Sequence, residues 1–411
     1  MVMQKSLVAN VPTPFRRIVA YVFAATLLIR IPCWILVNLL PAWRPRRSWT
    51  IRKSVGVNVI RYLFEGLGRF GMDCLFYRPT HKKLETGRGA NGVYVGAVPE
   101  LITGQVKEWA EKANVQSVQL PGYWMHKKGL TIPVEQKPSP DEKVVYFLHG
   151  GAYITLSAHP KSPTSIIPLG FLKFIPEVKR SFAIEYRLSS IPPEPTEGPF
   201  PSALIDAIAG YVYLINKVGY KPEQVIVAGD SAGGNLAHAL TLYLSSHKGK
   251  VEGLPDVPGA LILISPWTDM SGSHNTPTSS VITNLKSDYL KPPSEPYSVD
   301  APTAFIAPFG KEFTSQTAYI SPASKQLPAS SLDYSGFPKT FITAGDAEVL
   351  LDQIRELSKR MKGGMGERVV YYEAKDAFHD YLCIDFAEPE RSETLRAIAD
   401  FVKGGEADER A

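Results

Sequence analysis

A serine in a glycine-rich motif is the residue that most directly indicates chemistry. The motif consists of Gly229, Asp230, Ser231, Ala232 and Gly233. An apolar run at 225–228 precedes it and a stretch with helical periodicity follows it, so we expect Ser231 on a sharp turn between a strand and a helix. A serine hydroxyl at such a turn can attack an ester carbonyl, and the glycines relieve the crowding that the turn imposes. The alternative is an ordinary serine in a glycine-rich turn.

A second motif could stabilise the charge that acyl transfer creates. It consists of His149, Gly150, Gly151 and Ala152, directly after the apolar run 144–148. Negative charge develops on the carbonyl oxygen, and preset backbone N–H groups stabilise that charge. We predict that this turn, Gly150 included, forms an oxyanion hole in which Gly151, Ala152 and Ala232 donate their N–H groups. His149 is expected to order the loop rather than act as a base.

The base that such a serine needs is offered near the C-terminus. His379 lies in a loop directly after the predicted strand 369–373. From there it could take the Ser231 proton and return it to the leaving alkoxide. His238 lies among apolar residues of the helix predicted to follow the serine, and we interpret it as a packed helical residue.

The third partner is a carboxylate that orients the histidine and stabilises the imidazolium. Asp346, Glu348 and Asp352 all follow the predicted strand 339–344 and compete for this role. Asp380 is adjacent to His379 in sequence, and we do not expect it to reach the imidazole ring. The residues alone leave the three candidates open.

The elements that must position these groups alternate in type. We predict strands at 144–148, 181–186, 224–228, 260–264, 339–344 and 369–373, and helices at 202–218, 232–246, 350–362 and 392–403. This alternation indicates an α/β fold, with a mostly parallel central sheet and helices on both faces. Upstream of it we expect helices at 54–77 and 99–113, a loop at 78–100 and a strand within 116–130. The Ser-, Pro- and Thr-rich stretch 270–318 is predicted as a loop over the site.

Composition excludes several other classes of protein. Only three cysteines occur among the 411 residues and none forms a CxxC pair, which disfavours a cysteine-based zinc site or a thioredoxin-type redox site. Residues 1–64 contain ten Lys or Arg and no Asp or Glu, which leaves 35 basic and 40 acidic residues in the remainder. Because the main part of the chain is mildly acidic, we expect no nucleic-acid partner.

The basic, apolar N-terminus points to a membrane instead. The uncharged run Ile18–Ile29 and the apolar stretch Ile31–Trp43 are separated only by Arg30. Together they are long enough for a single-pass or re-entrant anchor if Arg30 is tolerated within the span, and an interfacial helix is an alternative. A helix buried in the protein core is the third interpretation. The heavier positive flank follows the apolar stretches, which favours a cytosolic catalytic domain. We expect the endoplasmic reticulum as the compartment.

Taken together, the motifs resemble the hormone-sensitive-lipase-like branch of the α/β-hydrolases. The text YRL at 186–188 is followed by PFPSALID at 199–206, and SPWTDM occupies 265–270, beside the HGGA and GDSAGG motifs. The resemblance implies an α/β-hydrolase fold, an acid at Glu348 rather than Asp352 or Asp346, and no metal or organic cofactor. Ala152 departs from the family, because many members have glycine there, and its methyl group would narrow the site.

The same resemblance implies a division of the chain and an activity. We expect a membrane anchor at 1–45, a helical cap region at 46–140, a catalytic domain at 141–405 and a polar tail at 406–411.

The N-terminus resembles that of membrane-associated fungal members, including those that remove acetyl groups from sterols. The expected enzyme is a serine carboxylester hydrolase that cleaves short-chain, acetyl-like esters of apolar alcohols. An acyltransferase, a lipase and an amide or formamide hydrolase could use the same triad, whereas a non-catalytic small-molecule receptor usually loses a triad member. The oligomeric state cannot be read from the sequence.

Overall fold

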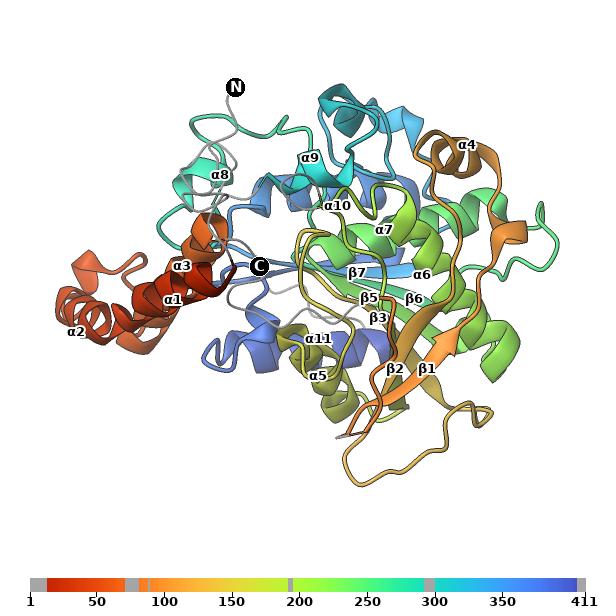
Figure 1. The fold of residues 1–411 in the computed structure, drawn as a ribbon, viewed down its shortest axis with the longest axis horizontal. Coiled ribbons are helices and arrows are strands. Elements are labelled where there is room, and N and C mark those ends of the chain that lie inside the picture. Colours follow the sequence, from red (N-terminus) through yellow and green to blue (C-terminus); the bar gives the residue numbers. More distant parts are fainter. Residues whose placement is uncertain (1–12, 71–80, 88, 191–194, 292–299, 405–411) are drawn as a thin grey trace.

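The structure is a computed structural model, and it describes residues 13–70, 81–87, 89–190, 195–291 and 300–404. The predicted polar tail at 406–411 lies outside these residues. Figure 1 shows a central twisted sheet with helices on both faces and a group of N-terminal helices at one side.

Eight strands form one sheet, in the order β1-β2-β4-β3-β5-β6-β7-β8. Their bounds are Asn91–Val95 (β1), Leu120–His126 (β2), Lys143–Leu148 (β3), Val178–Ile184 (β4), Val225–Asp230 (β5), Ala260–Ile264 (β6), Lys339–Gly345 (β7) and Val369–Ala374 (β8). β2 pairs antiparallel with β1 and β4, and the other pairs are parallel. The carboxyl ends of β3, β5, β7 and β8 therefore lie along one edge, where the four predicted site segments begin.

Helices cover both faces of this sheet (Figure 1). One face carries α6 (Ser202–Val212), α7 (Ala232–His247) and α10 (Leu351–Met365), and the other carries α5 (Ile166–Phe174) and α11 (Glu390–Lys403). Both faces are apolar, since β5 and β6 are buried at every residue. Strands buried on both faces are typical of parallel sheets between helical layers.

The remaining elements are short or lie outside the sheet. They are α4 (Gly104–Lys112), α8 (Ser280–Thr283), α9 (Ala301–Phe305) and a π-helical turn at Tyr213–Val218 that continues α6. Turns of 3₁₀ helix occupy Pro41–Trp43, Pro99–Leu101, Pro163–Ser165, Pro222–Gln224, Lys311–Ser315, Ala329–Ser331, Gly366–Arg368 and Tyr381–Cys383.

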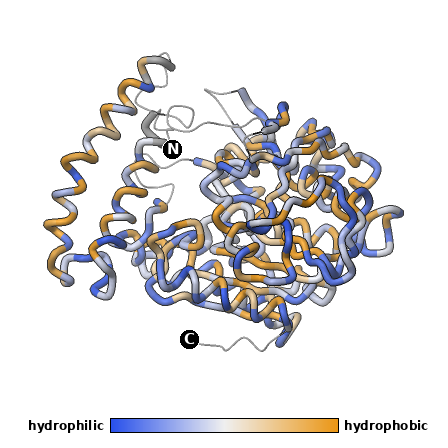
Figure 2. The backbone as a smooth tube through the Cα atoms, turned by 90° about the horizontal axis from the view of Figure 1, so that it is seen from below, coloured by the Kyte–Doolittle hydropathy of each residue, from blue (hydrophilic) through white to orange (hydrophobic). Residues whose placement is uncertain are grey.

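The N-terminal helices project from the body of the molecule. α1 (Thr13–Ala25) and α2 (Leu27–Val37) both contact α3 (Ile51–Phe70), which joins them to the rest of the molecule. Figure 2 shows their apolar residues standing clear of the main mass. The stretch Arg17–Val37 is long and apolar enough to cross a membrane, and only 6% of its most apolar window is buried.

The segment 46–140 differs from the helical cap that we expected. It holds α3 and α4, but it also contributes β1 and β2, so the central sheet begins at Asn91 rather than after 140. β1 falls in the predicted loop 78–100. It is a half-exposed edge strand that begins with Asn91 and Gly92, so its sequence lacks the longer apolar run of the central strands. Within the predicted loop 270–318, the described residues form only α8, α9 and the turn at Lys311–Ser315 as helical elements.

Candidate active site

Ser231 occupies a strained turn between β5 and α7. Its φ is 53° and its ψ is −117°, a region that residues with a side chain rarely adopt. A Cβ on Gly229 would lie 2.2 Å from the carbonyl oxygen of Gly233, and a Cβ on Gly233 would lie 2.0 Å from that of Leu148. Only glycine fits at either position, so the two glycines permit the sharp turn that presents the serine, as the motif predicts.

His379 approaches this serine from the loop that follows β8. Its Nε2 lies 3.0 Å from Oγ of Ser231, which is hydrogen-bond distance, and its side chain is almost fully buried. The two residues are 148 positions apart in the chain, and the parallel sheet brings them together at its carboxyl edge. The arrangement allows the imidazole to accept the serine proton.

Of the three candidate acids, Glu348 lies beside the far ring nitrogen. Its Oε2 is 4.0 Å from Nδ1 of His379, longer than a hydrogen bond, although such contacts often tighten when substrate binds. The same oxygen accepts hydrogen bonds from Ser265 Oγ at 2.6 Å and from the Gly345 amide at 3.2 Å. Burial raises the pKa of Glu348 to about 8, although the facing histidine, when charged, favours the ionised form.

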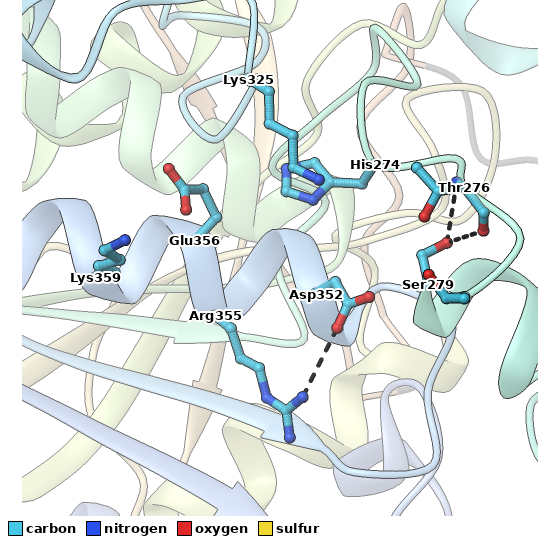
Figure 3. A pocket seen from close by; sticks show the side chains of 9 residues that line it. His274, Thr276, Ser279, Lys325, Asp352, Arg355, Glu356 and Lys359 are labelled. Carbon is cyan, nitrogen blue, oxygen red and sulfur yellow. Dashed lines mark hydrogen bonds and ion pairs between the residues drawn. The ribbon is translucent and has the colours of Figure 1, made fainter.

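The other two acids have partners elsewhere. Asp346 pairs with Arg46 and accepts the amide of Asp376. Asp352 accepts the amide of Ser280 and lies 3.7 Å from Arg355. Figure 3 shows Asp352 and Arg355 in a charged surface pocket at the start of α10, where Asp352 points into the pocket.

The turn after β3 corrects one of our expectations. The Gly150 amide donates a hydrogen bond of 2.9 Å to Oδ1 of Asp230, so it is not free to bind an oxyanion. The next two residues, Gly151 (φ 104°) and Ala152 (φ 54°), have left-handed backbone conformations. Among the described residues, the amides of Gly151, Ala152 and Ala232 have no acceptor. These three N–H groups, with Ala232 at the N-terminus of α7, are free to bind an anion.

His149 stabilises the same turn through a hydrogen bond and ring stacking. Its Nδ1 lies 2.7 Å from the Gly150 carbonyl oxygen, and its ring stacks on Tyr186 at 4.2 Å between centroids. The Tyr186 hydroxyl donates to the His149 carbonyl at 2.5 Å. Burial lowers the pKa of His149 to about 4, so the imidazole is neutral and orders the loop.

His238 is packed inside the protein. Its side chain is buried next to Tyr334 and Phe337 on the inner face of α7, and burial lowers its pKa to about 3. These contacts match its interpretation as a packed helical residue.

Two carboxylates near the histidine were missed or misjudged from sequence. Oδ2 of Asp380 lies 3.1 Å from Nε2 of His379, so our expectation that Asp380 does not reach the ring is wrong. Asp380 has φ 49°, and this left-handed conformation turns its side chain back toward its neighbour. Asp288 is fully buried and accepts the amides of Tyr289 and Val349, both at 2.7 Å, and that of His379 at 3.4 Å. It lies in the stretch predicted as a loop, where no pattern indicated it.

An apolar wall stands beside the oxyanion turn. Ile154, Ala301 and Ala304 form a buried cluster, and Ala152 and Trp267 pack against it. The Trp267 amide donates to the Ser231 carbonyl at 2.9 Å, which fixes this tryptophan next to the serine. The apolar surface therefore lies close to the place where an acyl group would be bound.

Comparison with known proteins identifies the family. Residues 144–383, more than half of the chain, match the family described as alpha/beta hydrolase fold. This chain belongs to that family. An esterase of the bacterial hormone-sensitive lipase (HSL) family has the same fold, with a TM-score of 0.55 and 21% identity over 91% of this chain and 97% of its own. The predicted α/β-hydrolase fold is thereby confirmed.

Relatives of this α/β-hydrolase carry esterase names. Esterase LipU of Mycobacterium tuberculosis is 29% identical over 262 residues, which cover 64% of this chain and 77% of the relative. Acetyl-hydrolase of Streptomyces hygroscopicus is 28% identical over 263 residues, 64% of this chain and 76% of its own. Steryl acetyl hydrolase 1 of Saccharomyces cerevisiae is 28% identical over 136 residues, 32% of this chain and 28% of its own. The chain is accordingly a hydrolase of the carboxylesterase type.

Proposed function

We propose that this α/β-hydrolase is a serine carboxylesterase whose triad is Ser231, His379 and Glu348. The observation that carries the proposal is the 3.0 Å distance between His379 Nε2 and Ser231 Oγ, with the serine on a strained turn that presents it. A serine is a weak nucleophile unless an adjacent base takes its proton, and this pair meets that requirement. Glu348 is the acid that best fits, since Asp346 and Asp352 are bound elsewhere.

The proposed reaction proceeds through an acyl-enzyme. Ser231 Oγ attacks the ester carbonyl carbon while its proton passes to Nε2 of His379. The oxyanion binds the amides of Gly151, Ala152 and Ala232, and the imidazolium then protonates the departing alkoxide. Water attacks the acyl-enzyme with His379 again as base, which releases the carboxylic acid and restores the Ser231 hydroxyl.

For the substrate we propose short-chain, acetyl-like esters of apolar alcohols. The methyl group of Ala152 and the side chains of Ile154 and Trp267 favour a small or apolar group beside the oxyanion turn. The acetyl-hydrolase and steryl acetyl hydrolase names of two relatives support a small acyl group.

We further propose that residues 1–45 attach the enzyme to a membrane, with the catalytic domain on the cytosolic side of the endoplasmic reticulum. The supporting observation is the exposed apolar stretch Arg17–Val37. Arg44, Arg46, Arg47, Arg52 and Lys53 follow it. Basic flanks of this kind remain on the cytosolic side. The segment 46–140 would then join the anchor to the catalytic domain and contribute β1 and β2 to its sheet.

The test is an ester-chain series with the full-length protein in detergent micelles. p-Nitrophenyl esters from acetate to palmitate are compared, with Ser231→Ala as the matched variant and a fluorophosphonate as the active-serine label. We expect acetate or butyrate to turn over fastest, and both turnover and labelling to vanish in Ser231→Ala. Equal turnover by the folded variant would exclude the triad, and a maximum at long chains would indicate a lipase instead.

A further inference from the structure

The catalytic nitrogen of His379 faces two oxygen atoms. Nε2 lies 3.0 Å from Oγ of Ser231 and 3.1 Å from Oδ2 of Asp380. Both distances are those of hydrogen bonds, but a neutral or charged imidazole carries at most one hydrogen on this nitrogen. The serine and the carboxylate therefore compete for the same atom.

The chemistry of the two contacts is opposite. To act as a base, Nε2 must offer a lone pair to the Ser231 hydroxyl. An ionised carboxylate can only accept a hydrogen bond, so Asp380 prefers Nε2 to be protonated. When Nε2 loses its hydrogen, its lone pair faces a carboxylate oxygen, and the base-competent form is disfavoured.

The carboxylate of Asp380 has few other hydrogen-bond partners among the described residues. Its side chain is only 10% exposed, and its second oxygen, Oδ1, has no hydrogen-bond partner among the described residues. Its amide donates to Ser265 Oγ at 3.3 Å, and the Ser265 hydroxyl in turn donates to Glu348. Because a buried carboxylate without partners is costly, its contact with the imidazolium is strongly favoured.

We propose that Asp380 is a fourth catalytic side chain, which holds the Nε2 proton of His379 in the resting enzyme and so moves the working range of the reaction above neutral pH. This inference rests on the proposed serine esterase mechanism. Asp380 touches the nitrogen through which the proton passes, and it stabilises the same imidazolium that forms when Ser231 attacks.

The other carboxylates around His379 also favour its protonated form. Burial lowers the pKa of His379, but the carboxylates of Asp380, Glu348 and Asp288 outweigh burial and raise it to about 9. Asp230, which is buried at the end of β5, is a further acidic group near the histidine. Burial and the nearby Asp380 raise the pKa of Asp230. The ring of Tyr289 lies 5.7 Å from the imidazole. The guanidinium of Arg61 donates a hydrogen bond to the carbonyl oxygen of Asp288.

The proton balance of the reaction is kept. Above its pKa, His379 loses the Nε2 proton to solvent, and the lone pair then takes the Ser231 proton as Oγ bonds to the carbonyl carbon. The new Nε2–H is held between the substrate oxygen and Asp380 until the departing alkoxide, a much stronger base than a carboxylate, accepts it.

The test compares the pH profiles of the wild type, Asp380→Asn and Asp380→Gly as full-length proteins in micelles. Asparagine removes the charge at constant size, and glycine removes the side chain; both tolerate the left-handed backbone at this position. Two rates are measured between pH 6 and 10.5: kcat/KM for p-nitrophenyl acetate, corrected for spontaneous hydrolysis, and the second-order rate of fluorophosphonate labelling of Ser231. Asp385→Asn is the matched control, because Asp385 is an exposed carboxylate five residues from Asp380 along the chain.

We expect the acid limb of both wild-type profiles near pH 9 and a shift of at least one unit toward lower pH in at least one Asp380 variant. A limb that moves by one unit raises the rate at pH 7 about tenfold while the rate at pH 10 changes little. Asp385→Asn should leave the limb in place. Limbs that stay at the wild-type pH in both Asp380 variants would overturn the role of Asp380, with the triad intact. Absence of labelling in the wild type at every pH would instead overturn the esterase mechanism itself.

Discussion

Arg46 joins the loop of the proposed acid to the loop of the proposed base. Its Nη2 donates a hydrogen bond of 2.6 Å to the carbonyl oxygen of Asp346, two residues before Glu348. Its Nη1 lies 3.1 Å from Oδ2 of Asp346 and 3.8 Å from Oδ1 of Asp376, three residues before His379. A residue that lies directly after the proposed membrane anchor thus fixes the geometry of both catalytic loops.

Replacing this arginine should therefore slow catalysis from outside the site. In Arg46→Ala we expect kcat to fall about tenfold with little change in KM, because the acid and base lose alignment while the substrate surfaces remain. The loss of a charge-assisted contact that is about one quarter exposed should cost about 1–2 kcal/mol of unfolding free energy. Steady-state kinetics and urea denaturation measure the two effects. The exposed neighbour Arg47→Ala is the control, and equal loss in both variants would contradict the role of Arg46.

The choice of Glu348 as acid can be tested against its rival. Glu348→Gln keeps the size of the side chain but removes the charge that stabilises the imidazolium, so kcat should fall about 10³- to 10⁴-fold. Asp352→Asn should stay within a few-fold of the wild type, because Asp352 binds the Ser280 amide at a surface pocket. Turnover of p-nitrophenyl acetate measures both. A larger loss in Asp352→Asn than in Glu348→Gln would reverse the assignment.

The turn around Ser231 predicts a strong effect of a single methyl group. In Gly233→Ala the new Cβ would lie 2.0 Å from the Leu148 carbonyl oxygen and 2.5 Å from that of His149, so β3 and α7 would have to separate. We expect a loss of more than about 3 kcal/mol of unfolding free energy or failure to fold. Gly363→Ala is the control, since its added Cβ on α10 would have no neighbour within 4 Å outside the local helix backbone. It should gain about 0.5–1 kcal/mol, and thermal unfolding measures both variants.

The central elements could be predicted because their sequence signal is local. The apolar run at 260–264 became β6 with the same bounds, and the glycine spacing around Ser231 already indicated its turn. β1 could not be predicted, because a half-exposed edge strand has no apolar run. α5, which we did not predict, is apolar on nearly all sides and contains a proline and a glycine, so its periodicity is hidden.

The parts of the site that the sequence does not reveal depend on contacts between distant residues. The Gly150 amide is bound by Asp230, 80 positions away, and adjacency in a motif does not show such a contact. Asp380 reaches His379 because of one left-handed residue, which a sequence pattern cannot indicate for aspartate. Asp288 accepts the amides of Val349 and His379, which lie 61 and 91 positions away, so only the folded chain brings them together.

Glu185 makes the stability of the protein depend on pH. Its carboxyl group is buried and accepts hydrogen bonds from Ser157 Oγ at 2.6 Å and the Ala158 amide at 3.1 Å. Burial raises its pKa from 4.5 to about 7, so the native state binds this proton more tightly than the unfolded state does. The stability from this group is fully present below pH 4.5 and is lost as the pH rises through about 7.

We therefore expect Glu185→Gln to flatten the pH dependence of stability. Between pH 5 and pH 8 the unfolding free energy of the wild type should fall by about 2–3 kcal/mol more than that of the variant, as a shift of this size implies. Urea denaturation at the two pH values measures the difference, with the exposed Glu223→Gln as control. The same slope in the wild type and Glu185→Gln would show that this group does not titrate in that range.

Deletion of the N-terminal helices should abolish membrane binding and leave catalysis intact. Leu28, Ile29 and Leu36 are 81%, 72% and 64% exposed, and burial of such a surface in a bilayer is strongly favourable. Removing residues 1–45 takes away this surface and leaves Arg46 in place. We expect the shortened enzyme to stay in the supernatant of a salt-washed membrane fraction and to hydrolyse p-nitrophenyl acetate in solution at the rate of the full chain.

A longer deletion provides the matched comparison, because the next residues hold the catalytic loops. Arg61 donates to the carbonyl oxygens of Asp288 and Lys286, both within 2.8 Å, and Asp288 in turn binds the amides of Val349 and His379. Removing residues 1–65 eliminates Arg46 and Arg61 together, so we expect soluble protein with a greatly reduced kcat. If the 1–45 deletion still sediments with membranes, the anchor lies elsewhere. If the 1–65 deletion keeps full activity, the two arginines do not position the catalytic loops, and the anchor and the active site are independent parts of the chain.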